Sequence, residues 1–425
     1  MSEQAEVLII GAGPAGLSAA LAAADDGMQV VLLDDNPLPG GQIWRDGAGA
    51  QVPAQARRLR DVVDNHASIQ RYAATRVVAR AGSHALLVED AERGWVIAYH
   101  KLILCTGARE LLLPFPGWTL PGVTGAGGLQ ALIKGGLPVA GERTVIAGSG
   151  PLLLASASTA KQAGAQVLRI AEQASTGAVA AFALQLPRWP HKLLQSFGLL
   201  DGGYRPGTRI VAALGQDRLE GVRLQRDGKL EELGCERLAC GFGLIPNVQL
   251  GQALGCALGS AAIKVDAWQA TDRAGIYAAG ECTGFGGSEL ALVEGRIAGH
   301  AAAGNREAAR RMWATRARWQ RFADALNKHF ALDPALKRLA QPDTLLCRCE
   351  DVPYAAVAAH SNWREAKLAT RCGMGACQGR ICGGATQYLF DWQPVTPRPP
   401  FAPSRIGTLM QLEEAAQSSS PRTCS

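Results

Sequence analysis

The first 42 residues alternate between apolar runs and turn-forming residues. The apolar run "EVLII" (residues 6–10) is followed by the glycine-rich "GAGPAG" and then by an alanine-rich stretch. Gly27 ends that stretch, and a second apolar run, "QVVLL" (residues 29–33), leads directly to Asp34. Short apolar runs bounded by turn residues are typical of buried parallel strands. The pattern therefore predicts a strand, a tight turn, a helix, a second strand and then an acidic residue.

Each glycine of this turn has a mechanical role in binding a dinucleotide. Gly11 allows the tight turn, Gly13 lets the backbone approach a pyrophosphate, and Gly16 lets the helix pack closely on the strand. The N-terminus of the helix presents free N–H groups to phosphate, and an acid about twenty residues further on binds ribose. The contacts predicted for this first nucleotide site are Gly11, Gly13, Pro14, Ala15, Gly16, Asp34, Asp35, Gly41 and Gln42.

Two later segments indicate which dinucleotide binds. "KLILCTGARELLLPFPG" (residues 101–117) is a predicted strand that ends at Thr106 and Gly107, and residues 275–304 form a strand, the pair Gly280 and Glu281, and a long helix. Here the chain resembles the two-dinucleotide-domain flavoprotein reductases of the glutathione reductase type. The resemblance implies FAD in the first site, with Glu281 in place of the more common Asp at the ribityl chain. The alternative for Glu281 is a helix-capping acid.

A second copy of the pattern lies inside the chain. "RTVIAGSGPLLLASASTAKQAGAQVLRIAEQAS" (residues 143–175) repeats the order strand, Gly148, Gly150, helix, strand and Glu172. Leu153 replaces the third glycine, and its branched side chain is expected to push the helix away from the strand. Two interpretations stay open: a nucleotide (NAD(P) or ATP) that does not react, or a domain retained as structure.

Five of the eleven cysteines fall within residues 347–382. Thiolates bind iron–sulfur clusters and zinc, and the glycines of "CGMGACQGRICGG" allow that loop to wrap closely around a cluster. The segment resembles the bacterioferritin-associated ferredoxin-like domain, which carries a [2Fe-2S] cluster. The resemblance implies four ligands, with structural zinc as the alternative metal: Cys347, Cys349, Cys377 and Cys382. Cys372 is expected to be a small buried residue; the alternative is that it competes as a ligand. The other six are expected to be buried without chemistry: Cys105, Cys235, Cys240, Cys256, Cys282 and Cys424.

These motifs predict an α/β chain with two interleaved Rossmann-like domains and a small C-terminal cysteine domain. The predicted divisions are an FAD-binding domain (1–116 and 246–305), a NAD(P)-like domain (117–245), a helical linker (306–342), the [2Fe-2S] domain (343–392) and a proline-rich tail (393–425). A tail of that composition is expected to lie along a partner protein or to be disordered.

Charge and composition exclude several classes of protein. The net charge of +6 comes without a run of five or six like charges, so no nucleic-acid partner is expected. The N-terminus lacks a signal-peptide pattern, and no stretch of about eighteen apolar residues occurs, which predicts a cytoplasmic protein. No Cys-x-x-Cys exists, and no cysteine follows Gly41 directly, which argues against disulfide-reductase chemistry.

Nearly the whole chain resembles one subunit of the heteromeric dye-linked dehydrogenases: opine oxidase, hydrogen cyanide synthase, and the proline and hydroxyproline dehydrogenases. The resemblance implies an electron-transfer subunit with no catalytic acid or base of its own, and the hydroxyproline branch is favoured. It also implies a partner FAD subunit of the D-amino-acid-oxidase-like type, a small ferredoxin-like subunit, an FMN at the subunit junction, a quinone acceptor, and a location at the inner-membrane periphery as an alternative. Two other hypotheses are a self-sufficient NAD(P)H-dependent reductase and a zinc-binding scaffold.

Overall fold

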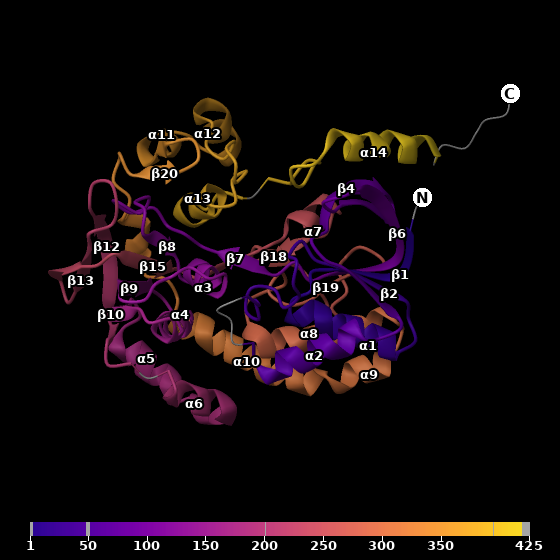
Figure 1. Cartoon of the computed structure of the whole chain (residues 1–425), viewed down its shortest axis with the longest axis horizontal. Helices are drawn as coiled ribbons and strands as arrows, with labels where there is room; N and C mark the ends of the chain where they lie inside the picture. The colour runs from indigo at the N-terminus through magenta and orange to yellow at the C-terminus, as the bar shows by residue number, and fades with distance from the viewer. Residues whose placement is uncertain (1–2, 48–51, 200, 394, 419–425) are drawn as a thin grey trace.

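Two α/β units lie side by side, and the cysteine-rich segment and the C-terminal helix lie along the same edge of the pair (Figure 1). The computed structural model describes residues 3–47, 52–199, 201–393 and 395–418. Each unit is built on its own sheet, with helices packed on it. The predicted α/β class is therefore confirmed.

The first unit contains a seven-stranded sheet with the order β3-β2-β1-β6-β5-β4, in which β19 also pairs with β6. Strands β3, β2, β1, β6 and β19 are parallel, whereas β4 and β5 join as an antiparallel extension. The two apolar runs at the N-terminus are β1 and β2, as predicted. The strands are β1 (Glu3–Ile10), β2 (Val30–Leu33), β3 (Ile69–Tyr72), β4 (Arg76–Gly82), β5 (Ala85–Glu89), β6 (Gly94–Leu104) and β19 (Ile276–Ala278).

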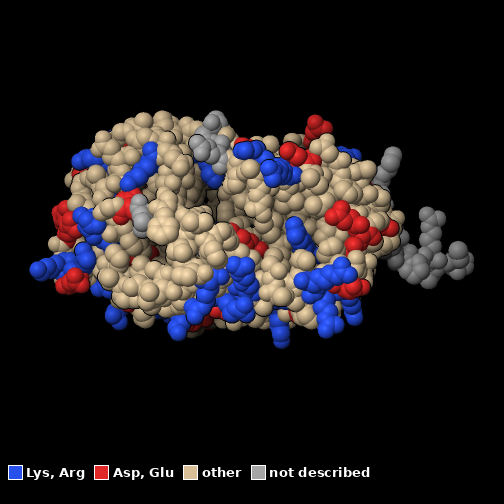
Figure 2. Space-filling model, turned by 90° about the horizontal axis from the view of Figure 1, so that it is seen from below, with Lys and Arg blue, Asp and Glu red and all other residues tan. Residues whose placement is uncertain are grey.

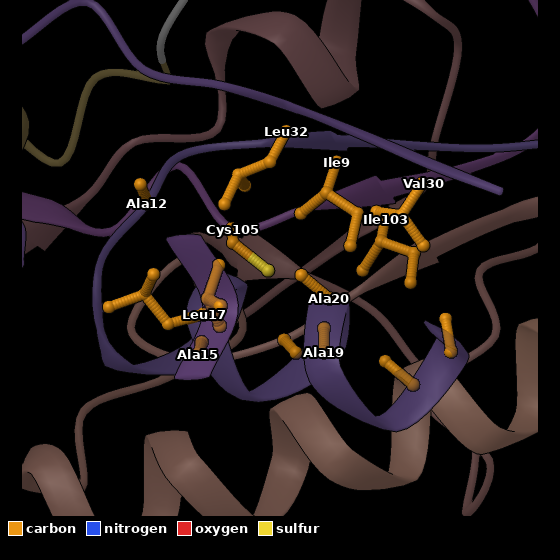
Figure 3. Packing of buried hydrophobic residues seen from close by; sticks show 14 of the residues in the cluster. Ile9, Ala12, Ala15, Leu17, Ala19, Ala20, Val30, Leu32, Ile103 and Cys105 are labelled. Atoms are coloured by element: carbon orange, nitrogen blue, oxygen red, sulfur yellow. The ribbon is translucent and has the colours of Figure 1, made fainter. Parts of the chain in front are cut away.

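Small residues bring two helices of this unit into close contact. Helix α8 (Gly287–Ala302) packs against α1 (Pro14–Asp25), and a Cβ added at Gly299 would lie 2.9 Å from the Cβ of Ala22. Figure 3 shows the other face of α1 against the sheet, with the sulfur of Cys105 directed toward the helix. The alanine-rich composition therefore serves a close helix–helix and helix–sheet contact. The remaining helices of the unit are α2 (Ala54–Asp64) and α7 (Gln249–Ala253).

The second unit repeats this plan with a five-stranded parallel sheet of order β11-β10-β9-β15-β8. Its parallel strands are β8 (Val123–Gly125), β9 (Arg143–Gly148), β10 (Gln166–Glu172), β11 (Tyr204–Pro206) and β15 (Arg237–Gly241). An antiparallel sheet follows, made of β12 (Thr208–Leu214), β13 (Gly221–Arg226) and β14 (Lys229–Gly234). The helices are α3 (Ala126–Lys134), α4 (Leu152–Gln162), α5 (Thr176–Ala183) and α6 (Pro190–Phe197).

Two short antiparallel strands, β7 (Ala108–Glu110) and β16 (Leu244–Pro246), connect the units. The chain leaves the first sheet after β6, builds the second unit and returns to the first sheet at β19. A small hairpin, β17 (Leu258–Gly259) with β18 (Ala262–Ile263), precedes that return.

The cysteine-rich segment follows two helices, α9 (Arg306–Arg311) and α10 (Trp313–His329). It consists of β20 (Leu345–Cys347), β21 (Val352–Pro353), α11 (Tyr354–Ala358), α12 (Trp363–Thr370) and α13 (Cys382–Phe390). No helix among the described residues is long and apolar enough to cross a membrane. Basic and acidic side chains are interspersed on the face seen in Figure 2.

The prediction for the C-terminal tail was wrong, because the tail packs on this chain's own first unit. The backbone N–H of Phe401 donates to the carbonyl of Val78 at 2.7 Å, and that of Arg405 donates to Glu89 at 2.9 Å. Helix α14 (Ile406–Ser418) then places Leu409 against the sheet formed by β4 and β5. The proline-rich stretch is thus an extended connection, and the apolar residues beyond it supply the packing.

Candidate cofactor sites

The first glycine turn is held by backbone contacts from several strands. The N–H of Gly11 donates to the carbonyl of Leu33 at 2.7 Å, and the N–H of Gly40 donates to the carbonyl of Ala12 at 2.7 Å. Gly11 has φ +104°, and a Cβ there would overlap the carbonyl oxygen of Cys105. A Cβ at Gly13, by contrast, would meet nothing closer than 3.8 Å. The space beside Gly13 is therefore open, and the approach of a pyrophosphate there stays a prediction.

The two acids after β2 have different positions. Asp34 is 5% exposed, and its carboxylate accepts the N–H of Ala12 at 2.6 Å and that of Asn36 at 2.8 Å. Asp35 is exposed. Asp34 therefore holds the turn from within, and Asp35 accepts a hydrogen bond from the side chain of Asn36 at 3.1 Å. The contact of either acid with ribose stays a prediction.

The segments that contain Thr106 and Gly280 both lie beside the first glycine turn. The hydroxyl of Thr106 donates to the carbonyl of Asn247 at 2.6 Å, and the N–H of Asn247 donates to the carbonyl of Gly107 at 2.9 Å. A Cβ at Gly280 would lie 2.8 Å from that of Ala15, so Gly280 adjoins the first turn of α1. Glu281 is half-buried, and this burial raises the pKa of its carboxyl. Glu281 does not cap α8, because that helix begins six residues later. Its contact with the ribityl chain stays a prediction.

A residue that the sequence did not single out supports this segment. Glu294 on α8 is 4% exposed and accepts the N–H of Gly280 at 3.0 Å. Burial raises the pKa of Glu294 to about 7, and Arg316, 3.8 Å away, opposes the shift. The one signal in the sequence is that Glu294 lies within an alanine-rich helix. Acids are rarely buried without a partner, so an acid in such a helix is a candidate for a structural hydrogen bond.

The second glycine turn is anchored in the same way as the first. Glu172 is fully buried, and its carboxyl accepts the N–H of Gly150 at 2.7 Å and that of Ala174 at 2.8 Å. Burial raises the pKa of Glu172 to about 7. Glu172 thus anchors the second turn as Asp34 anchors the first, and a contact of Glu172 with a bound nucleotide stays a prediction.

Leu153 fits into the second unit because its neighbour on the sheet is a glycine. In the first unit, a Cβ at Gly16 would lie 3.4 Å from the Cβ of Cys105. In the second unit, the Cδ2 of Leu153 lies 3.0 Å from where a Cβ of Gly241 would be, and Leu153 is fully buried. In the first unit the helix supplies the glycine and the sheet side supplies the larger Cys105. In the second unit the helix supplies the larger Leu153 and the sheet supplies the glycine. The expectation that Leu153 displaces the helix was therefore wrong.

This exchange predicts a strong coupling between the two positions. Leu153→Ala should cost about 2–5 kcal/mol by leaving a cavity, and Gly241→Ala about 1–3 kcal/mol by overpacking. The double variant should cost less than the sum of the two, because the shortened side chain makes room for the new Cβ. Denaturant unfolding of the four proteins measures the coupling, and strict additivity would contradict it.

The second turn is covered by the chain's own linker, which did not follow from the sequence. The hydroxyl of Ser149 donates to the carbonyl of Phe330 at 2.8 Å. Gln173 donates to the carbonyl of Ala331 at 2.9 Å and accepts the N–H of Asp333 at 2.8 Å. Gln173 follows Glu172 as Asp35 follows Asp34. The side chain that follows the anchoring acid is thus bonded within the protein in the second unit.

The cysteine segment brings five thiols together. Cys347 ends β20, Cys382 begins α13, and Cys372 follows α12; the Sγ atoms of these three lie within 4.8 Å of one another. The Cys372 hydrogen bond and burial raise the pKa of Cys382. Cys349 is exposed and hydrogen-bonds to Cys377. Cys372 is buried as expected, but it lies inside the group of thiols rather than apart from it.

Glycines shape the loop around these thiols. The N–H of Gly373 donates to the Sγ of Cys347 at 3.5 Å, which is the kind of support that a bound thiolate receives in metal sites. A Cβ at Gly375 would overlap the Cβ of Cys349, and one at Gly373 would lie 2.6 Å from Trp363. The loop therefore wraps tightly, and its soft sulfur donors suit an iron–sulfur cluster or zinc.

Arg109 links the two candidate sites. Its guanidinium donates to the side-chain oxygen of Asn247 at 3.1 Å, and Asn247 holds Thr106 of the first site. The same guanidinium donates to the carbonyl of Arg380 at 3.0 Å, inside the cysteine loop. The sequence did not predict this role for Arg109, because its partners lie 138 and 271 residues away in the chain.

The other cysteines agree with their predicted role. Five are buried, and none of these five belongs to the group of thiols: Cys105, Cys235, Cys240, Cys256 and Cys282. Burial raises the pKa of the Cys105 thiol well above its usual range. Cys424 lies outside the described residues.

Two glycine turns, each on its own α/β unit, and the connecting strands β7 and β16 are the arrangement of the two-domain flavoprotein oxidoreductases. Residues 5–306 match the pyridine nucleotide-disulphide oxidoreductase family, and the chain belongs to it. It is 32% identical to hydrogen cyanide synthase subunit HcnB of Pseudomonas protegens, over 89% of this chain and 90% of the relative. It is also 32% identical to an opine oxidase subunit of Rhizobium meliloti, over 96% of this chain and 99% of the relative. The solved L-proline dehydrogenase from P. horikoshii shares the fold, with a TM-score of 0.64 and 19% identity over 96% of this chain and 80% of that one.

Proposed function

We propose that this chain is the electron-transfer subunit of a heteromeric amino-acid dehydrogenase. It takes electrons from a partner subunit with a D-amino-acid-oxidase-like flavin site and passes them to a quinone or another acceptor. Hydroxyproline, proline or an opine is the proposed substrate class. The similarity to HcnB and to the opine oxidase subunit supports the need for a partner, because both relatives are named as subunits.

The residues fit FAD in the first site and a [2Fe-2S] cluster in the cysteine loop. The open backbone at Gly13 and the N–H groups of α1 would hold the pyrophosphate, Asp35 the ribose, and Glu281 the ribityl chain. A flavin accepts electrons in pairs and a [2Fe-2S] cluster carries them singly, so the two together convert two-electron to one-electron transfer. The proposed cluster ligands are Cys347, Cys349, Cys377 and Cys382.

The contact made by Arg109 carries this proposal. Because one side chain donates hydrogen bonds to both Asn247 and the carbonyl of Arg380, it connects the loop beside the flavin site with the cysteine loop. Such a contact would serve electron transfer between a flavin and a cluster, because it holds their two loops together. A scaffold that only binds zinc would not require it.

Arg109→Ala is expected to slow electron delivery to an external acceptor several-fold while leaving the bound FAD unchanged. Losing its three hydrogen bonds, to Pro246, Asn247 and Arg380, should also lower the free energy of unfolding by about 1.5–4.5 kcal/mol. The exposed Arg58→Ala on α2 serves as control. Acceptor reduction by the assembled complex, with flavin content measured on the same samples, would test this. Equal rates in the two variants would contradict it.

The second candidate function is a self-sufficient NAD(P)H-dependent reductase. The contacts of residues 330–333 with Ser149 and Gln173 count against it, because they occupy the polar groups that a nicotinamide dinucleotide would use.

An anaerobic absorption spectrum of the purified chain, with iron, zinc and sulfide assayed on the same sample, decides between these functions. Flavin bands with equal amounts of iron and sulfide, and no bleaching by NADH, are the expected result. Rapid bleaching by NADH would make the chain a reductase in its own right. Zinc without sulfide would remove the one-electron carrier.

A further inference from the structure

Three buried thiols converge from three different elements of the cysteine segment. Cys347, Cys372 and Cys382 are each at most 1% exposed, and their Sγ atoms all lie within 4.8 Å of one another. Thiolates that share one tetrahedral metal ion with bonds of about 2.3 Å stand about 3.8 Å apart. Each of the three thiols is therefore placed to bind the same metal ion after a small movement.

A [2Fe-2S] cluster offers fewer positions than this arrangement supplies. Four protein ligands hold such a cluster, two on each iron. The thiols of Cys349 and Cys377 interact with each other and would form a natural pair for one iron. Three thiols then remain for the two positions on the other iron.

Local contacts distinguish the members of the buried three. Cys347 receives the N–H of Gly373, which fixes its Sγ in place. Both Cys347 and Cys372 lie within hydrogen-bonding reach of Cys382. Because Gly373 holds Cys347 in place, Cys372 and Cys382 are the two thiols that compete for the remaining position.

We propose that Cys372 is a second ligand for the iron position assigned to Cys382, so that either thiol can complete the cluster. The inference rests on the proposed cluster. Exchange breaks one iron–sulfur bond, forms another and passes one proton from the incoming thiol to the outgoing thiolate, without any change in the number of electrons. This arrangement would let the cluster survive the loss of one buried ligand.

The test compares five variants of the full-length chain by iron and sulfide content per chain and by electron paramagnetic resonance of the dithionite-reduced protein. Cys382→Ala should keep most of its iron and sulfide with a shifted resonance, and Cys372→Ala should keep the wild-type content. Cys372→Ala/Cys382→Ala should lose nearly all of both. Cys349→Ala, a ligand with no spare thiol assigned to it, should also lose them, and Cys256→Ala controls for removal of a buried cysteine.

A Cys382→Ala protein that loses its iron and sulfide as completely as the double variant would overturn the proposal. If that variant does not retain its flavin and its circular dichroism, Cys382→Ser replaces it in the same comparison. The wild-type assay tests the proposed function separately. Zinc without sulfide in the wild-type chain would overturn the proposed cluster, and the cysteine variants would then be compared by their zinc content. A wild-type chain that contains neither iron nor zinc would overturn both proposals.

Discussion

Gly16→Ala is expected to abolish flavin binding and to destabilise the first unit. A Cβ at this position would overlap the carbonyl oxygen of Gly11 and come within 2.9 Å of its carbonyl carbon. These are backbone atoms of the glycine turn, so they cannot move aside as a flexible side chain would. Relief requires α1 to shift away from β1, which also moves the helix N–H groups from the pyrophosphate position. We expect a loss of about 3 kcal/mol in the free energy of unfolding.

Gly177→Ala provides the matched control, because Gly177 also lies in the first turn of a helix. A Cβ there would meet only the hydroxyl of Ser175, at 4.0 Å. Flavin content per purified chain and the thermal unfolding temperature measure the difference. If Gly16→Ala retained its flavin and unfolded at the temperature of Gly177→Ala, the close helix–turn contact would not control the site.

Stability is expected to fall as the pH rises from about 5 to 8, because two glutamates are buried in their protonated form. The pKa values of Glu172 and Glu294 are raised by burial to about 7, from 4.5. Between these values the unfolded chain releases protons that the folded chain keeps, so stability present below pH 4.5 is lost as the pH passes through about 7. Each carboxyl accounts for about 3 kcal/mol.

Glu294→Gln and Glu172→Gln should each flatten this pH dependence by about the same amount. The quantity to compare is the slope of the unfolding free energy against pH. The absolute stability is not comparable, because the amide nitrogen of a glutamine at position 172 would face a backbone N–H and destabilise the variant at every pH. Glu307→Gln, whose side chain is 78% exposed, should leave the slope unchanged. Urea unfolding at several pH values tests this, and slopes equal to that of the wild type in both variants would refute it.

The sequence predicted the fold well where the signal was local. The glycine turn, the strands on either side and the terminating Gly27 lie within one stretch, and neighbouring residues determine such a turn. The roles of Asp34 and Asp35 could not be assigned in this way. Both sit at the right distance along the chain, and only the direction of each side chain after β2 decides which one bonds to the turn.

The C-terminal tail shows where composition misleads. The proline-rich stretch correctly indicated an extended backbone, but its packing depends on the apolar residues of α14 and on the exposed sheet of β4 and β5. The sheet that receives the tail is more than 300 residues away in the chain. No local pattern contains that information.

By itself, the sequence determined the two glycine turns, the order of strands and helices and the gathering of cysteines near one end, because each depends on residues close together in the chain. Tertiary structure decided what these features do. Only in the folded chain does the large Leu153 pack against the small Gly241, and only there does the linker bond to Ser149. The contact of Arg109 with both candidate sites and the proximity of Cys372 to Cys382 also appear only in the folded chain. These contacts follow from how separate elements pack, and packing depends on the complementary shapes of residues that no spacing relates.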